Sequence, residues 1–392
     1  MSLFQTDSLS RRLDTPNFPF IFAAVVYFLF VLVRLAVHDW DVSYFVTAGD
    51  AFTDATEAPA GLQVFRDQQG HDGQFYYRLA LDPFTDRVTD YGITLDLPAY
   101  RHQRLLYPLL AHVLAFGDAG YIPLCMLMIN YFGVCAIAWS GSRLMQLYGL
   151  HAGWGLALAC YPGFVLALAR DFNEILAAAL VIYALCLVYR QQHWGAAGIF
   201  SLGVLTRETS VLVPVAIGIT GIFARVRGGP RQAIAPYILP VATGVAWQLY
   251  LRYNWGHFAV SDTGTMGLPF VSFAQSLFAK TDFASGQQIA GFVQMLLVAV
   301  FAVAAGMAWR SSSARPYEKA AWLVYVGLAC IVSGNVWSED WSFLRNLWEL
   351  YAFGAIILAT SKSRVRTLMF ACWGALWVFE MALRTDAHKV WS

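Results

Sequence analysis

The sequence predicts an all-α polytopic membrane protein that forms a single domain from residue 1 to residue 392. Of its residues, 58% are hydrophobic and only 13% are charged, whereas an ordinary soluble domain carries about 25% charged residues. Apolar stretches long enough to cross a bilayer, which takes about 20 residues, recur along the whole chain. The formal net charge of +1 gives no support for nucleic-acid binding, which usually requires a basic face.

Eleven apolar segments are predicted to be transmembrane helices. They cover residues 18–37, 121–141, 154–170, 172–189, 194–206, 208–224, 234–252, 287–308, 320–337, 342–360 and 366–384. The first segment is long enough to span and is not followed by a small-residue cleavage site. It therefore predicts a membrane anchor and not a cleaved signal peptide.

A twelfth apolar segment, residues 105–116, is too short for a span and contains His112. Its length favours a re-entrant or interfacial helix. The positive-inside rule supports this interpretation, because counting the segment as a span would place the basic clusters at 225–231, 310–319 and 362–366 outside. With eleven spans and a cytoplasmic N-terminus, these clusters are cytoplasmic.

This topology predicts two long outer loops, residues 38–104 and 253–286. The same rule assigns most of the remaining basic residues of the short loops to the cytoplasm. They include Arg11 and Arg12 near the N-terminus, whereas Arg231 closes the 225–231 cluster, and the few acidic residues on that side include Asp7.

Three charged motifs lie at predicted outer helix ends: ARDFNE at 169–174, LTRETS at 205–210 and SEDWSFLRNLWELY at 338–351. A charge near a helix centre costs about 2.5–3.5 kcal/mol on insertion scales, so charged groups at membrane depth are expected to be paired or functional. The predicted topology places all three motifs on the same side as the long first loop.

Each motif also has a structural explanation. Arg170 and Glu174 are four residues apart, as are Arg345 and Glu349, and this spacing permits a salt bridge along one helix face. Arg207 has no such local partner. A simple salt bridge and phosphate binding therefore remain alternative roles for Arg170 and Arg345.

The first outer loop holds two candidate functional carboxylates. The run HDGQFYYRLALDPF at 71–84 predicts an amphipathic helix that lies on the membrane and ends before Asp82 and Pro83. Asp72 stands at its N-terminus, where it is either a helix cap or a functional group. Asp41, in DWDVSYF at 39–45, presents the same two alternatives.

Together these features resemble the GT-C superfamily of polyprenyl-phosphate-sugar-dependent glycosyltransferases. HDGQFYYRLALDPF, AYRHQRLLYPLLA, YPGFVLALARDFNE and VLTRET are similar to the pattern of bacterial integral membrane proteins of cell-surface glycopolymer formation. They are more distantly similar to the GPI mannosyltransferase II type. The resemblance covers about residues 38–215 and departs from the pattern at His71, where a Trp is expected, and at Gly73, where several other members carry a second acid.

The resemblance implies inverting transfer of a sugar from a polyprenyl-phosphate donor to a hydroxyl of a glycan or glycolipid acceptor. The reaction would occur on the outer, periplasmic face of a bacterial inner membrane. Asp72 is the expected general base, with Asp41 as the rival. A leaving phosphate needs positive charge, for which the candidates are Arg170, Arg207, Arg345, Arg104 and Arg101. The remaining candidate substrate-binding residues are Tyr76, Tyr77, Gln103, Asp171, Glu174, Glu208 and Glu349.

No cofactor is required by this chemistry. Asp39, Asp41 and Asp72 could approach one another, so dependence on Mg²⁺ or Mn²⁺ stays open. Two other functions compete with transfer: a flippase or transporter for a lipid-linked saccharide, and a non-catalytic component of a polysaccharide assembly complex. A transporter commonly shows inverted repeats with broken helices in matching positions, and this sequence shows neither.

Overall fold

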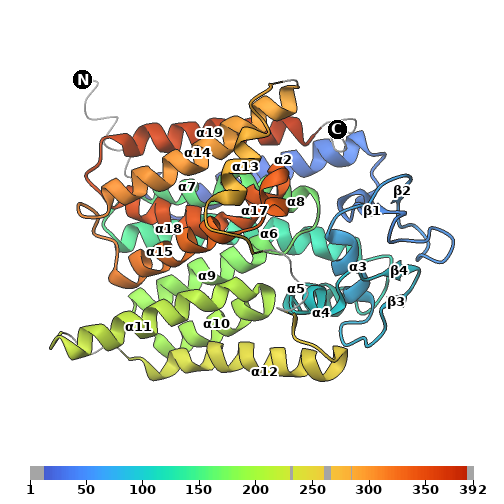
Figure 1. The fold of residues 1–392 in the computed structure, drawn as a ribbon, viewed down its shortest axis with the longest axis horizontal. Coiled ribbons are helices and arrows are strands. Elements are labelled where there is room, and N and C mark those ends of the chain that lie inside the picture. The colour runs from blue at the N-terminus through green and yellow to red at the C-terminus, as the bar shows by residue number, and fades with distance from the viewer. Residues whose placement is uncertain (1–12, 230–232, 260–265, 284, 386–392) are drawn as a thin grey trace.

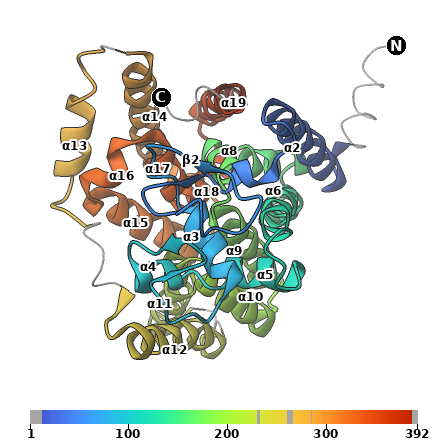
Figure 2. The same cartoon turned by 90° about the vertical axis from the view of Figure 1, so that its right-hand side faces the viewer.

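A computed structural model describes residues 13–229, 233–259, 266–283 and 285–385. The described chain is mostly helical, and its long helices lie side by side (Figure 1). The loop at residues 38–104, predicted to be the first outer loop, covers one end of this bundle, and Figure 2 looks directly onto that end. Asp7, Arg11, Arg12 and Arg231, which entered the prediction of topology, lie outside the described residues.

All eleven predicted segments contain helix. Eight of them are covered mainly by one helix each: α2 (Asn17–Val37), α6 (Ile122–Leu147), α9 (Glu174–Tyr189), α10 (His193–Thr206), α12 (Ile238–Trp255), α14 (Gly286–Ala308), α15 (Pro316–Ile331) and α19 (Val365–Leu383). Short helices flank some of these: η4 (Ala235–Tyr237), α13 (Val271–Phe278) and α16 (Gly334–Ser338).

The other three segments are each made of more than one helix. They consist of η2 (Ala152–Gly155), α7 (Leu156–Ala159) and α8 (Pro162–Ala169); of η3 (Glu208–Val211) and α11 (Leu212–Val226); and of α17 (Asp340–Asn346) and α18 (Trp348–Ala359). The first of these bends by 53° between residues 159 and 162. Pro162 explains the bend, since proline starts a helix well but cannot continue one.

Five helical stretches of the described chain are long and apolar enough to cross a membrane. These are α2, α6, the continuous stretch Glu208–Val226, α14 and α19, and the bent pair of helices from Ala152 to Ala169 would make a sixth. The apolar helices α9 and α18 are shorter and form much of the interior, since every residue of α18 is buried. The described chain is therefore a helical protein, and several of its helices are long and apolar enough to cross a membrane.

The first outer loop has its own small framework. It contains η1 (Val42–Phe45), the parallel strands β1 (Ala48–Gly49) and β2 (Val64–Phe65), and the antiparallel strands β3 (Thr89–Asp90) and β4 (Ile93–Thr94), and it ends with α4 (Pro98–His102). Tyr91 and Gly92, between β3 and β4, both have positive φ, 52° and 68°. Two such residues match a type I′ hairpin turn, whose twist suits paired strands.

The helix predicted from the run at 71–84 is α3 (Gly73–Leu81), and it ends where the Asp82-Pro83 pair predicts. Its predicted place on the membrane surface is wrong, because all nine of its residues are buried. The apolar face packs against protein, mainly α5 (Leu106–Leu114) and α6. The polar Gln74 is also satisfied internally, where its Oε1 accepts hydrogen bonds from the Gly49 amide at 3.2 Å and from Thr53 Oγ1 at 3.0 Å.

The segment at 105–116 forms α5, which has nine residues and is too short to cross a bilayer. The prediction that this segment is not a regular span is thus confirmed for its length. Its His112 is bound inside the protein, with Nδ1 2.8 Å from the Ala80 carbonyl oxygen at the end of α3. The short α5 therefore holds α3 in place beneath the loop.

His102 joins the first outer loop to α12. The Trp255 indole donates a hydrogen bond to His102 Nδ1 at 3.1 Å, so the other ring nitrogen carries the hydrogen and donates to the Pro83 carbonyl at 2.8 Å. Trp247 packs edge-on against the imidazole. Burial lowers the pKa of His102 to about 4. Protonation would also remove the acceptor that Trp255 uses.

We predict that this contact weakens in mild acid. The folded-state pKa lies below the unfolded value of about 6.5, so the stabilisation is complete above pH 6.5 and falls as the pH drops toward 4. The loss amounts to about 3 kcal/mol at about 1.4 kcal/mol per unit. Thermal unfolding of the detergent-solubilised protein between pH 7 and 4.5 checks this. His102→Gln should flatten the pH dependence, and an unchanged slope would contradict it.

Candidate functional site

Asp72 lies between two arginines that come from distant parts of the chain. Its Oδ1 is 2.8 Å from Nη1 of Arg101, and its Oδ2 is 2.7 Å from Nη2 of Arg345. Although Asp72 occupies the residue before α3, its side chain makes no capping hydrogen bond there. The residue is only 8% exposed. The carboxylate is thus committed to ion pairs and not to the helix.

The surroundings keep Asp72 ionised. Burial raises the pKa of Asp72, but Arg101 and Arg345 outweigh it and hold the value well below the usual range. The preceding residue, His71, is neutral, because burial and the nearby Arg170 lower its pKa well below the ordinary value. In this arrangement Asp72 is a carboxylate of low basicity, since both of its oxygens are neutralised.

The ion pairs continue inward from Asp72. Arg345 Nη1 lies 3.4 Å from Oε1 of Glu174, and the same oxygen is 2.8 Å from Nη1 of Arg207. Arg207 Nε is in turn 3.4 Å from Oε1 of Glu349. All of these groups are buried. The short turns and the loop at residues 38–104 therefore meet at one end of the bundle.

The partners differ from those that helical spacing suggested. Glu174 pairs with Arg207 and Arg345, and Glu349 pairs with Arg207. The i,i+4 salt bridges considered for Arg170 with Glu174 and for Arg345 with Glu349 are not what holds these carboxylates. A break in the helix at Leu347, between α17 and α18, separates Arg345 from Glu349. Tertiary contacts replace the local pairs.

On its outer side the chain of ion pairs ends at Asp96. Arg101 donates through Nε to Oδ1 of Asp96 at 2.8 Å and through Nη2 to Oδ2 at 2.7 Å. This two-point geometry fixes the plane of the guanidinium, which also lies 4.4 Å from the centre of the Phe75 ring. Asp96 was not among the residues predicted from the sequence, because its spacing from the other charges follows no helical or motif pattern.

Arg104 forms a second branch of the site. Its guanidinium bonds to Glu208 through Nε at 3.3 Å and Nη2 at 3.2 Å, and it donates to the hydroxyl groups of Tyr76 and Tyr100, both at 2.8 Å. Burial opposes the charge on Arg104, but Glu208 outweighs it and raises the pKa well above the ordinary value. The Glu208 side chain is 33% exposed, more than any other carboxylate that pairs with these arginines.

In the described chain the site contains four arginines and five carboxylates, of which Arg104 and Glu208 form a pair beside the chain of the other seven. Its members are Arg101, Arg104, Arg207, Arg345, Asp72, Asp96, Glu174, Glu208 and Glu349. Arginine is the residue best suited to bind phosphate, through paired donors. Here, however, every guanidinium faces a carboxylate. An anionic ligand would have to exchange with one of these carboxylates.

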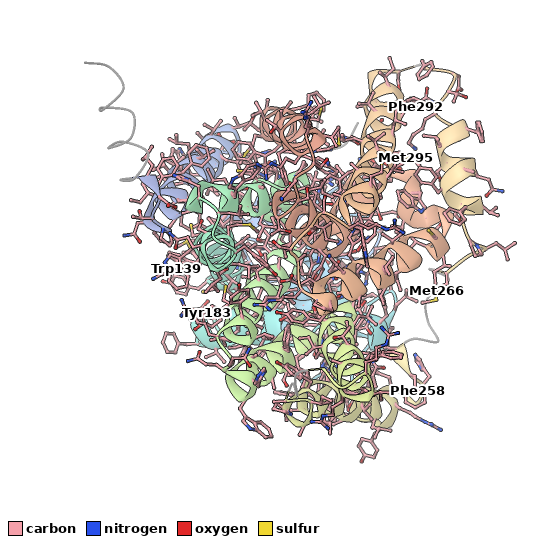
Figure 3. The ribbon with its side chains drawn as sticks, turned by 90° about the vertical axis from the view of Figure 1, so that its left-hand side faces the viewer. Trp139, Tyr183, Phe258, Met266, Phe292 and Met295 are labelled. Carbon is pink, nitrogen blue, oxygen red and sulfur yellow. The ribbon has the colours of Figure 1, made fainter. Side chains whose placement is uncertain are left out.

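A cavity of about 210 Å³ opens beside this site. Its polar end is formed by Arg104, Arg207, Glu208 and Glu349 together with Gln103, Asn346 and Thr209. Its apolar wall is formed by α15, the start of α18 and the loop before α13, through Tyr325, Leu328, Ala329, Ile331, Val332, Leu347, Leu350 and Met266. Met266, at the edge of the molecule in Figure 3, is 64% exposed. The cavity therefore runs from buried charges to the molecular surface along an apolar wall.

Two further predicted charged residues, Arg170 and Asp171, lie near the site. Arg170 is buried, and its guanidinium lies 5.6 Å from the centre of the Trp341 ring. Asp171 is fully buried with φ at 50°, and neither of its carboxylate oxygens has a hydrogen-bond partner among the described residues. Asn130 is a side chain that interacts electrostatically with Asp171. Its Nδ2 donates a hydrogen bond to the Tyr107 hydroxyl at 2.8 Å.

Tyr76 and Tyr77, two of the candidate substrate-binding residues, are buried inside the protein. Tyr76 and Tyr77 are 0% and 1% exposed, so neither ring presents a face for stacking. The Tyr76 hydroxyl accepts a hydrogen bond from Arg104, and the Tyr77 hydroxyl donates one to the Ala119 carbonyl at 3.2 Å. Gln103 lines the cavity, and its Oε1 accepts from Gln248 at 3.3 Å.

Asp41 lies apart from the chain of ion pairs. Its side chain accepts a hydrogen bond from the Ser43 amide at 2.8 Å and caps η1. Among the described residues, no group of three or more His, Cys, Asp or Glu side chains is arranged to hold a metal ion. Asp39, Asp41 and Asp72 therefore do not form the shared metal site considered from the sequence.

Comparison with known proteins found no family model that matches the chain and no curated protein that matches it in sequence. The resemblance to GT-C enzymes thus rests on the motifs in the chain and on its layout.

We predict that Arg207 is needed for stability. Arg207→Gln leaves Glu174 and Glu349 buried without that charge, and breaking a buried pair costs about 3–5 kcal/mol. Arg87→Gln is the matched control, because Arg87 pairs with Asp90 at 3.4 Å on the surface and such pairs contribute about 0–1 kcal/mol. Thermal unfolding of the purified variants measures both. Equal shifts in midpoint for the two variants would show that the buried pairs contribute no more than the surface pair.

Proposed function

We propose that this protein is a membrane glycosyltransferase that moves a sugar from a polyprenyl-phosphate donor to an acceptor hydroxyl. The observation that carries the proposal is the series of ion pairs that joins Asp72 to an amphipathic cavity. Two ion-paired groups, Arg345 and Glu174, link Asp72 to Arg207, which lines that cavity. A polyprenyl phosphate has the matching chemistry, an anionic head on an apolar chain.

In this proposal the phosphate lies at the polar end of the cavity and the first isoprenyl units lie along α15. Of the five arginines expected to bind phosphate, Arg104 and Arg207 line the cavity. Arg345 stands one ion pair deeper, beside Glu174. Arg101 is committed to Asp96 and Asp72, so its role is to hold Asp72 and not the donor.

The chemistry proposed is a single displacement with inversion. The acceptor oxygen bonds to the anomeric carbon while the bond from that carbon to the phosphate oxygen breaks. The electron pair of the broken bond goes to the phosphate, where Arg104 and Arg207 stabilise the charge. The proton of the acceptor hydroxyl goes to Asp72 as general base. Neither the displacement nor the proton transfer requires a bound metal. The acceptor in this proposal is a glycan or glycolipid.

We also propose that the eleven helical segments are eleven spans with a cytoplasmic N-terminus. The shorter helices α9 and α18 would cross within the protein interior, where neighbouring helices and not lipid surround them. Asp72 and the cavity then face the outside, which is the periplasm if the protein belongs to a bacterial inner membrane. The basic clusters at 225–231, 310–319 and 362–366 support this orientation.

The test is a transfer assay with purified protein, a polyprenyl-phosphate sugar and an acceptor. Asp72→Asn should reduce transfer by about 10²–10⁴-fold, the usual contribution of a general base. Asp41→Asn should change it little, because asparagine is also a good cap and Asp41 serves η1. Normal transfer by Asp72→Asn, with loss in Asp41→Asn, would reverse the assignment. Movement of the lipid without a new glycosidic bond would favour the flippase.

A further inference from the structure

Glu174 has an unusual arrangement for a buried carboxylate. Its Oε1 contacts both Arg207 at 2.8 Å and Arg345 at 3.4 Å. Its Oε2 is also buried and has no hydrogen-bond partner among the described residues. Glu174 is 0% exposed and does not line the cavity. One oxygen therefore holds two arginines while the other is unused.

This position makes Glu174 the link between the cavity and Asp72. Arg207 and Glu349 line the cavity, whereas Asp72 and Arg345 do not. From Arg207 to Asp72 the route runs through two groups, Glu174 and then Arg345. A change in the charge around Arg207 reaches Asp72 along this route.

The charges indicate the direction of that change. An anion bound at Arg207 competes with Glu174 for its guanidinium, because both negative charges are attracted to the same cation. As Arg207 turns to the anion, Glu174 is left to Arg345 and can use its second oxygen for a two-point contact. Arg345 then shifts from Asp72 toward Glu174.

We propose that Glu174 is a positioning residue that couples an anion in the cavity to the release of Asp72 from Arg345. This inference rests on the proposed function, in which the anion is the donor phosphate. Asp72 is then a weak base until the donor is bound and a stronger base afterward. Donor binding therefore precedes activation of the acceptor hydroxyl, and Glu174 itself touches neither substrate.

Trp341 offers a readout that does not depend on transfer. Its ring centre is 5.4 Å from the Arg345 guanidinium, so movement of Arg345 should change its fluorescence. The Trp341 signal is the difference between a protein and its Trp341→Phe variant. The probe is a ten-carbon prenyl monophosphate without a sugar, titrated into purified protein.

The expected result separates coupling from binding. In the otherwise unaltered protein, saturation with the probe changes the Trp341 signal. Glu174→Gln removes a negative charge beside Arg207, so it should bind the probe as tightly or several-fold more tightly, yet lose the Trp341 change. In the transfer assay the same variant should keep its donor KM or lower it while kcat falls at least about tenfold. Glu174→Asp, which keeps the charge, should restore part of kcat.

Several results would overturn the inference. One is the same Trp341 change in Glu174→Gln as in the unaltered protein, and another is no change in either at saturation. A third is a Glu174→Gln variant that raises the donor KM without lowering kcat, which would indicate direct substrate binding. If Glu174→Gln does not fold, Glu174→Asp carries the same test: it should bind the probe with a diminished Trp341 change, and a full change would overturn the proposal. Absence of transfer alongside the predicted fluorescence behaviour would refute the proposed function and leave the coupling intact.

Discussion

The arrangement of the site depends on the two ion pairs that Asp72 forms, one with Arg101 and one with Arg345. A charge removed from water is costly unless it is paired and hydrogen-bonded. Asp72 meets that condition only because Arg101 approaches from the outer loop and Arg345 from α17. The pairing requires the loop to fold back into the end of the helix bundle. The complete burial of α3 follows from the same requirement.

The same pairing limits what the site can do as it stands. Every arginine in the chain of ion pairs faces a carboxylate, and these carboxylates outnumber the arginines in the described site. Binding of a phosphate is therefore an exchange of partners and not an addition to an open positive pocket. Glu208 is the most accessible carboxylate for such an exchange, and Glu174, which is fully buried, is the one able to transmit it. In this view the affinity for the phosphate depends on Glu208, whereas the activation of Asp72 depends on Glu174.

Much of this organisation could be predicted from the sequence, and the failures have physical reasons. Apolar length located the helical segments, and the Asp82-Pro83 pair located the end of α3, because both signals are local. The burial of α3 was missed, since an amphipathic pattern is the same whether its apolar face meets lipid or protein. The pairing of Glu174 with Arg207 was missed for a related reason: helical spacing records only neighbours on one helix, and a tertiary partner leaves no such trace.

The most direct test of the account compares a prenyl monophosphate with the prenyl alcohol of the same chain length in binding to the purified protein. The two ligands share their apolar part and differ only in the anion. We expect the monophosphate to bind at least about tenfold more tightly, which is about 1.4 kcal/mol. We also expect the difference to shrink in an Arg104→Gln variant. Equal affinity for the two ligands would contradict the claim that this buried charge network receives a lipid-linked phosphate.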